Sequence, residues 1–214
     1  MLHELIYLID NYVEVKEIEL PIGLCIGEIT TEILEALCYS KKITNLSINL
    51  EAGSDRLLKF IGKEHTCEQA RNVFAKIHEA NPTVKILTTV MLGLPTENMG
   101  DILELAKLIL DTRPDDVHTN YFICSPNLPL AKYPQLSEMC REYHFKQFIK
   151  YVTTLPIQGY YEFKMECYQF WKRRFSRSAI KERELLQEEN EVRKKYGFLP
   201  YHLGIIMKIK RGER

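Results

Sequence analysis

A carboxylate, a glycine and a hydroxyl follow directly on the apolar run 46–50 of this chain. The residues are Glu51, Gly53 and Ser54, and a helix is predicted immediately afterwards, over residues 55–61. In parallel α/β sheets ligands collect at the carboxyl ends of strands, where side chains and free backbone N–H groups meet an anion or a hydroxyl. The sequence therefore predicts a binding site at Glu51.

The same three residues also suit structural roles, and the sequence leaves both interpretations open. Glu51 is equally suited to cap the next helix, and Ser54 is of a type that commonly forms a helix N-cap. Gly53 is expected to supply backbone freedom for the turn.

Two further predicted strands end in unusual turns. The β-branched run 84–92 is followed by Gly-Leu-Pro-Thr-Glu-Asn at 93–98, and the run 116–124 is followed by Ser-Pro-Asn-Leu-Pro at 125–129. Cys124, at the end of the second run, is most simply a small apolar residue of a strand. Polar turns thus recur at three strand ends, which is typical of a ligand-binding edge.

The three turns, in order and spacing, resemble motifs of the radical S-adenosylmethionine superfamily, particularly its tRNA methylthiotransferase-like and cobalamin-associated branches. Those motifs read E-S-G-S-D-x-x-L, G-x-P-G-E-T and S-P-x-P-G-T-P, and the resemblance covers roughly residues 2–133. The resemblance implies reductive cleavage of S-adenosylmethionine by a four-iron cluster, giving a 5′-deoxyadenosyl radical. The chain departs from the motifs at Thr96 and Asn98, where glycine and threonine are usual, and it lacks the final Gly-Thr.

The resemblance also implies cofactor contacts, while it assigns no catalytic residue. Glu51 would bind the ribose, because a carboxylate accepts hydrogen bonds from two vicinal hydroxyls. Lys63 would reach the methionine carboxylate, although a solvated lysine is the commoner outcome, and the strand ends at Leu92 and Cys124 would line the adenine. The complete set of cofactor-binding residues is Glu51, Gly53, Ser54, Lys63, Leu92, Gly93, Glu97 and Cys124. His65, a lone histidine before a helix, is expected at the surface.

The superfamily's cluster needs a C-x-x-x-C-x-x-C loop, and the 214 residues contain none. The cysteines are Cys25, Cys38, Cys67, Cys124, Cys140 and Cys167. Because no two are closely spaced, we assign no metal site and expect no cluster on this chain alone. Aligned on the motifs, residue 1 falls just before the family's third strand. We therefore expect a separately encoded first half or a homo-oligomer as partner. The alternative is a non-catalytic remnant of the fold that acts as an interaction module.

Composition indicates a globular protein, with 45% hydrophobic and 27% charged residues. No run of eighteen apolar residues and no charged-then-apolar leader is present, so we expect a cytoplasmic protein without a membrane segment. The scattered cysteines suggest reduced thiols rather than disulfides. Acidic residues are in excess by six over residues 1–160, and basic residues by six over 161–214.

Helix and strand patterns alternate as far as residue 124, which predicts an α/β fold: a partial parallel barrel of about four strands. Helices are predicted at 2–11, 32–39, 67–79 and 102–111, and the first strand at 15–20. Capping boxes are expected at Thr66 with Gln69 and at Asn98 with Asp101. The domains would be 1–134, the partial barrel, and 135–214, a basic and mainly helical extension.

The extension is predicted to hold a long helix at 160–196 and a strand at 203–210. Aromatic and basic residues are interleaved at 170–177, as on nucleic-acid-binding surfaces, but Phe163, Cys167, Phe170 and Trp171 share one helical face. We favour packing over RNA binding. The edge of the sheet at 15–20 would be covered by the strand 203–210, by a second copy of the chain, or by a separate first half.

Overall fold

The computed structural model describes residues 2–122, 124, 127–152 and 191. The elements, in order, are α1 (Leu2–Asp10), β1 (Ile18–Cys25), η1 (Ile26–Glu28), α2 (Thr31–Tyr39), β2 (Ile43–Glu51), α3 (Asp55–Phe60), α4 (Cys67–Ala80), β3 (Lys85–Leu92), α5 (Met99–Thr112), β4 (Asp116–Tyr121), η2 (Pro129–Lys132) and α6 (Glu138–Val152). The helix predicted at 160–196, the aromatic and basic stretch at 170–177 and the strand predicted at 203–210 lie outside the described residues.

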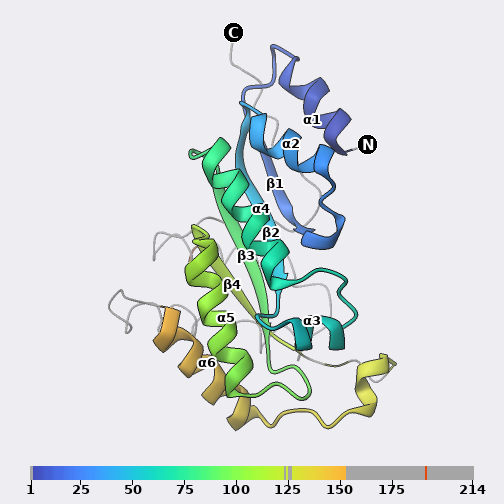
Figure 1. The fold of residues 1–214 in the computed structure, drawn as a ribbon, viewed down its shortest axis with the longest axis vertical. Helices are drawn as coiled ribbons and strands as arrows, with labels where there is room; N and C mark the ends of the chain where they lie inside the picture. Colours follow the sequence, from blue (N-terminus) through green and yellow to red (C-terminus); the bar gives the residue numbers. More distant parts are fainter. Residues whose placement is uncertain (1, 123, 125–126, 153–190, 192–214) are drawn as a thin grey trace.

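The four strands form one parallel sheet in the order β1-β2-β3-β4. Figure 1 shows that their carboxyl ends all lie at the lower end of the sheet, beside α3 and the turn that leads into α5. Helices α2, α4 and α5 pack side by side against one face. The predicted α/β fold, a partial parallel barrel, is confirmed over the described residues.

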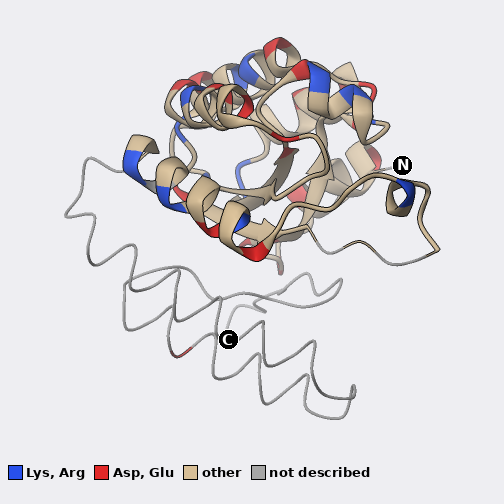
Figure 2. Ribbon diagram, turned by 90° about the horizontal axis from the view of Figure 1, so that it is seen from below, with Lys and Arg blue, Asp and Glu red and all other residues tan. Residues whose placement is uncertain are grey.

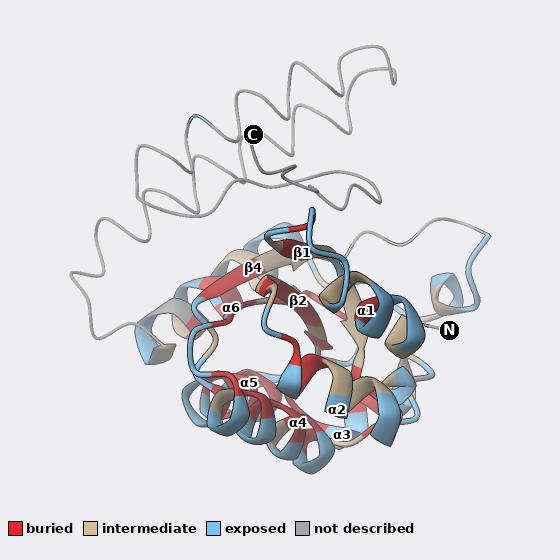
Figure 3. Ribbon diagram, turned by 90° about the horizontal axis from the view of Figure 1, so that it is seen from above, coloured by how far each residue is buried: buried red, intermediate tan, exposed pale blue. Residues whose placement is uncertain are grey.

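Strand β3 shows how the sequence divides the two faces of the sheet. Ile86, Val90 and Leu92 are at most 1% exposed, while Leu87 and Met91, which alternate with them, are only half-buried. Alternation with period two places the first set on the face that the helices cover and the second on the opposite face. Figure 3 shows the buried residues concentrated on the sheet and on the inner sides of the helices.

Two helices begin with the predicted capping boxes. The Thr66 hydroxyl accepts from the Gln69 N–H while the Gln69 side chain accepts from the Thr66 N–H, and α4 starts at the next residue. Asn98 and Asp101 form the same reciprocal pair at the start of α5. Each box satisfies backbone donors that a helix leaves unpaired in its first turn.

Two predicted strand boundaries are wrong. The first strand runs from Ile18 to Cys25 rather than over 15–20, and it continues through Pro21. Among the described strands β1 pairs only with β2, and a sheet edge tolerates a proline, here within a register shift between Leu20 and Leu24. At the other edge β4 ends at Tyr121, so Cys124 lies beyond the strand in which it was expected.

Charged residues lie mostly on the surrounding helices. Figure 2, seen from the carboxyl ends of the strands, shows lysine and arginine interspersed with aspartate and glutamate on these helices. Within the part of the chain that the structure describes, no helix is both long enough and apolar enough to cross a membrane.

Candidate functional site

The β2 turn, residues 51–54, begins with a distorted glutamate. Glu51 has a φ of 65°, in the left-handed region that L-residues avoid at a cost of about 1–2 kcal/mol. The register between β2 and β3 shifts between Asn49 and Glu51, which marks a β-bulge. Bulges re-aim a side chain and are enriched beside active sites. The sequence predicted a functional Glu51 but gave no sign of this conformation.

Lys63 is the partner of Glu51. Its Nζ lies 2.9 Å from Glu51 Oε1, and the two side chains keep 28% and 14% of their surface exposed. Burial alone would lower the pKa of Lys63, but the hydrogen bond and the negative charge of Glu51 outweigh it and raise the pKa above 10.5. The two residues, predicted as separate cofactor contacts, are therefore brought together at the carboxyl end of β2, and Lys63 is not simply solvated.

The histidine that was expected at the surface is buried. His65 is 4% exposed and lies beside Gly27 of η1, where an added β-carbon would be 3.8 Å from His65 Cβ. Burial, and then the charge of Lys63, lower the pKa of His65 below 6.5. The expectation failed because a segment almost forty residues earlier in the chain covers the ring, which the local sequence does not reveal. His65 is thus a buried, uncharged neighbour of Lys63 at neutral pH.

Gly53 is required for space and not for an unusual φ. A β-carbon there would lie 2.0 Å from Leu105 Cα, on the backbone of α5. Among the described residues, the glycines with positive φ are Gly62 and Gly93, so the predicted reason for Gly53 is wrong although the residue is essential to the turn. Close approach of helix to turn is the physical reason.

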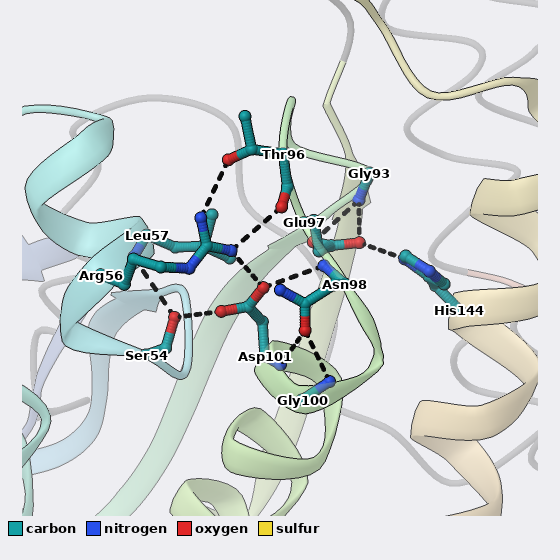
Figure 4. Close-up of polar contacts among 10 residues, drawn as sticks. All are labelled: Ser54, Arg56, Leu57, Gly93, Thr96, Glu97, Asn98, Gly100, Asp101 and His144. Atoms are coloured by element: carbon teal, nitrogen blue, oxygen red, sulfur yellow. Dashed lines mark hydrogen bonds and ion pairs between the residues drawn. The ribbon is translucent and has the colours of Figure 1, made fainter.

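Ser54 takes the structural role that the sequence left open. Its hydroxyl accepts from the Leu57 N–H at 3.3 Å as the N-cap of α3, and donates to Asp101 Oδ1 at 2.7 Å (Figure 4). Arg56 forms an ion pair with the other oxygen of Asp101. Asp101, the acidic partner of the N-cap Asn98 in the capping box of α5, therefore ties the β2 turn to the β3 turn.

The β3 turn, residues 93–98, contains two positive-φ residues, Gly93 at 82° and Thr96 at 68°. Thr96 occupies the position where the motif G-x-P-G-E-T has glycine, and a β-branched residue is strained there. Arg56 offsets this strain, donating to Thr96 Oγ1 at 3.1 Å and to the Thr96 carbonyl at 3.0 Å (Figure 4). The departure from the motif is thus accommodated locally.

Glu97 lies inside the β3 turn. Its side chain is 2% exposed; both oxygens accept from the Gly93 N–H, at 2.9 and 3.1 Å, and Oε1 lies 2.6 Å from His144 Nδ1 on α6. Burial raises the pKa of Glu97 above 4.5, opposed by the hydrogen bonds from His144 and Gly93. Glu97 therefore holds the turn, and neither its carboxylate nor the Gly93 amide is open to a ligand in this conformation.

Two predicted adenine contacts are placed differently from the expectation. Leu92 is 1% exposed and lies on the face that the helices cover, so its neighbour Met91 lies on the opposite face of β3. Cys124 is half-buried and lies beyond the end of β4. Strand parity explains the first difference, because successive side chains of a strand point to opposite faces.

A cavity of about 600 Å³ opens between α3, α4 and α5. Its basic lining residues include Arg56 and Arg71, and these are already paired with Asp101 and Asp111. Glu51 and Lys63 do not line it. Among the described residues, no group of three or more His, Cys, Asp or Glu side chains is arranged to hold a metal ion.

Sequence reasoning missed Arg56 and His144. Arg56 sits in the predicted helix 55–61 as an ordinary surface residue, and its partner Thr96 is forty residues away. His144 is forty-seven residues from Glu97, so no local spacing connects them. The departure of Thr96 from the motif was the one available signal that a neighbour must stabilise the β3 turn.

A parallel sheet of four strands covered by helices defines an α/β domain, and comparisons identify its class. The family model of the radical SAM superfamily matches residues 2–109. The chain belongs to the radical SAM superfamily.

Two relatives are similar over part of the sequence. A tRNA-2-methylthio-N(6)-dimethylallyladenosine synthase of Klebsiella pneumoniae (strain 342) is 30% identical over 105 residues, which are 49% of this chain and 22% of that protein. The corresponding synthase of Escherichia coli O1:K1 / APEC is 29% identical over the same lengths. The chain spans about a fifth of the length of these relatives.

Among solved structures, coproporphyrinogen III oxidase from Escherichia coli, described as a radical SAM enzyme, has a similar fold. The TM-score is 0.54 at 15% identity, covering 63% of this chain and 32% of that chain. This similarity supports the partial-barrel fold.

Proposed function

We propose that this chain forms the S-adenosylmethionine-binding wall of a radical SAM enzyme, with Glu51 at the ribose. One observation carries the proposal: Glu51 is held in a strained, bulged conformation at a strand end, partly exposed, in a member of this superfamily. Strained backbone that the surrounding structure maintains is concentrated at ligand sites.

The donors and acceptors at the β2 turn suit this cofactor. Oε1 of Glu51 accepts from Lys63, and a carboxylate has further lone pairs on both oxygens for the two hydroxyls of a ribose. The Lys63 ammonium has three hydrogens, of which the bond to Glu51 uses one. Because its pKa is raised above 10.5, Lys63 keeps its charge near neutral pH and can attract the carboxylate of the methionine part.

The four-iron cluster does not fit the described residues, which present no group of metal-ligating side chains. We propose that residues in the first half of the barrel, outside these 214 residues, hold it. In the superfamily this cluster supplies the electron that cleaves S-adenosylmethionine. The residues of this chain bind and orient the cofactor.

A second candidate is a non-catalytic interaction module, and one observation favours it. Helix α1 and the turn after it expose large apolar side chains, with Tyr7 at 70%, Leu8 at 66% and Val13 at 81% exposure. Neighbouring exposed apolar side chains are typical of protein-binding surfaces. This candidate predicts no cofactor binding at the β2 turn.

Cofactor binding separates the two candidates. We expect S-adenosylmethionine and 5′-deoxyadenosine to bind the full chain weakly, with Kd about 1 mM, because the contacts of the cluster are lacking. In an NMR titration, amides around Glu51 and Lys63 should shift, and Glu51→Gln should weaken binding about tenfold. Glu68→Gln, which removes an exposed partner of Arg71 on α4, is the matched control. Shifts that are absent, or that Glu51→Gln leaves unchanged, would refute the proposal.

Iron content tests where the cluster is held. After anaerobic reconstitution we expect iron and acid-labile sulfide to stay near background on the isolated chain. Stoichiometric iron with visible absorbance that Cys-to-Ser changes abolish would show that distant cysteines meet in space. Cluster recovery only on co-expression with a cluster-bearing first half would support the proposal.

A further inference from the structure

A thiol, an imidazole and a buried carboxylate stand in line on the outer side of the β3 turn. Cys140 and His144 are one turn apart on α6, and Cys140 Sγ lies 3.7 Å from His144 Nε2. The other ring nitrogen, Nδ1, is 2.6 Å from Glu97 Oε1, a contact that Figure 4 shows. The three groups come from two segments that the fold brings together, and the cysteine and histidine take no part in the site at the β2 turn.

The charge of Glu97 decides which nitrogen of His144 carries the proton. Both oxygens of Glu97 accept the Gly93 N–H. When Glu97 is ionised, its carboxylate has no proton to donate, and Nδ1 of His144 is the donor across the 2.6 Å contact. In the neutral ring Nε2 then holds a lone pair, and this lone pair faces the Cys140 thiol. Nucleophile, base and orienting group are thus in the order that activates a cysteine.

The position of Cys140 on its helix adds to this activation. Cys140 is the third residue of α6, a helix of 15 residues, and its N–H donates to the Ser137 hydroxyl at 3.2 Å. The positive end of a helix stabilises a nearby thiolate. The side chain is partly exposed, so a small reagent can reach it.

Other charged and titratable groups surround the pair. The Arg141 side chain on α6 packs over Gly93 and donates to the Phe122 carbonyl at 3.2 Å. The Tyr143 ring lies 6.4 Å from the His144 ring.

Cys67 provides an internal contrast. Its thiol is buried and donates to the Gly53 carbonyl at 3.1 Å. Burial, then the hydrogen bond and charge of Asp55, raise the pKa of Cys67 to about 12. Although Cys67 also opens a helix, its surroundings keep it protonated and inert, while Cys140 faces a base.

We propose that Cys140 is a reactive thiol, a modification site that forms a mixed disulfide with a low-molecular-mass disulfide such as oxidised glutathione. Cys140 Sγ attacks one sulfur of that disulfide, so that a new S–S bond forms as the old one breaks and its electron pair leaves with the second sulfur. The Cys140 proton passes to His144 Nε2 and then to the departing thiolate. Cys140 is oxidised and one half of the small disulfide is reduced.

Site-resolved labelling of the full chain tests the proposal. With limiting iodoacetamide at pH 7, read by peptide mass spectrometry, we expect Cys140 to react at least about tenfold faster than Cys67. His144→Asn, whose amide nitrogen can replace Nδ1 but not the base at Nε2, should slow Cys140 about tenfold or more at pH 7. His78 lies on α4 and bonds to the Thr112 carbonyl at the end of α5. His78→Asn should therefore leave the Cys140 rate unchanged.

Oxidised glutathione should add one glutathione to Cys140, removable by dithiothreitol. Equal Cys140 rates in the wild type and His144→Asn, or glutathione placed on other cysteines with Cys140 unmodified, would overturn the proposal. If His144→Asn unfolds, the comparison with a small thiol decides. Cys140 of the wild type that alkylates faster than reduced glutathione at pH 7 supports activation, whereas an equal or lower rate refutes it.

Discussion

The β2 and β3 turns lie at the same edge of the sheet and each contains a glutamate, yet the surroundings of the two carboxylates are opposite. Glu51 keeps 14% of its side chain exposed and pairs with the flexible Lys63. Glu97 keeps 2% and is enclosed by the Gly93 amide and His144. A strand end brings a carboxylate to the ligand-binding edge, but burial and neighbouring donors decide whether it remains available to a ligand.

The turns also differ in how they hold a strained residue. Thr96 in the β3 turn is fixed by two hydrogen bonds from Arg56. Glu51 in the β2 turn is fixed by a β-bulge and one ion pair. The first arrangement secures a structural loop, while the second keeps a side chain accessible, as a binding residue requires.

Replacing the glycine of each turn should change stability the most, and by different amounts in the β2 and β3 turns. Gly53→Ala places a β-carbon 2.0 Å from the backbone of Leu105, which cannot yield, so we expect a loss of about 3 kcal/mol or failure to fold. At Gly93 an added β-carbon would lie 2.5 Å from the flexible Arg141 side chain, and the backbone has a φ of +82°. We expect Gly93→Ala to lower the free energy of unfolding by about 2 kcal/mol. Gly62→Ala, at +79° with nothing within 4 Å, is the control for φ alone. Urea unfolding of the three variants gives the order of their stability losses, and equal losses at Gly53 and Gly93 would contradict the prediction.

Removing the two carboxylates should have unequal effects on stability. Glu97→Ala leaves the Gly93 amide and His144 buried without an acceptor, so we expect the free energy of unfolding to fall by about 3 kcal/mol. Glu51→Ala removes a partly exposed ion pair and should cost about 1 kcal/mol or less. Denaturant midpoints of the two variants provide the test, and similar losses would mean that Glu51 is structural.

Stability should depend on pH through Glu97. Because its folded pKa is raised above 4.5, the folded state holds the proton more tightly than the unfolded chain. The stability gained from this tighter proton binding is fully present below pH 4.5 and is lost as pH rises through the folded pKa of Glu97. Each pH unit between the unfolded and folded pKa values removes about 1.4 kcal/mol. Urea titrations between pH 4 and 7 should show this fall in the wild type and not in Glu97→Gln. The exposed Glu68→Gln is the control, and parallel curves for all three proteins would exclude the effect.

The smallest expected change concerns Thr96. Thr96→Gly relieves the left-handed strain of about 1 kcal/mol and loses an exposed hydrogen bond from Arg56, so we expect a net gain of about 0.5 kcal/mol. Thr30→Gly, at a φ of −70° and with a capping role at α2, should instead lower stability slightly. Thermal unfolding of both variants checks the sign, and a loss at Thr96 would show that the Arg56 contact outweighs the strain.

Much of the fold was predictable because its signals are local. The capping box at Thr66 located the start of α4, and the apolar runs 46–50 and 84–92 located β2 and β3. The box at Asn98 marked the next helix, but α5 starts at Met99, three residues before the predicted start at 102. The alternation at 15–20 located β1 only in part, because the strand continues through Pro21 to Cys25 and an edge strand tolerates a proline.

The site was predictable in part. Glu51 and Lys63 were expected from motif position, and the structure brings them together. The burial of His65 and the enclosure of Glu97 by His144 depend on contacts between segments distant in sequence. No pattern within one turn or one helix could reveal them, because tertiary packing determines both.

Asp101 has a consequence for how the two strand ends move. One carboxylate accepts from the Asn98 N–H, from the Ser54 hydroxyl and from Arg56, so the β2 turn, the β3 turn and the first turn of α5 share a single anion. A ligand that displaces the β2 turn must therefore shift the start of α5, or break a buried bond to leave it in place. We therefore expect the β2 and β3 turns to move together, because both are bonded to Asp101, which lies outside the proposed cofactor contacts.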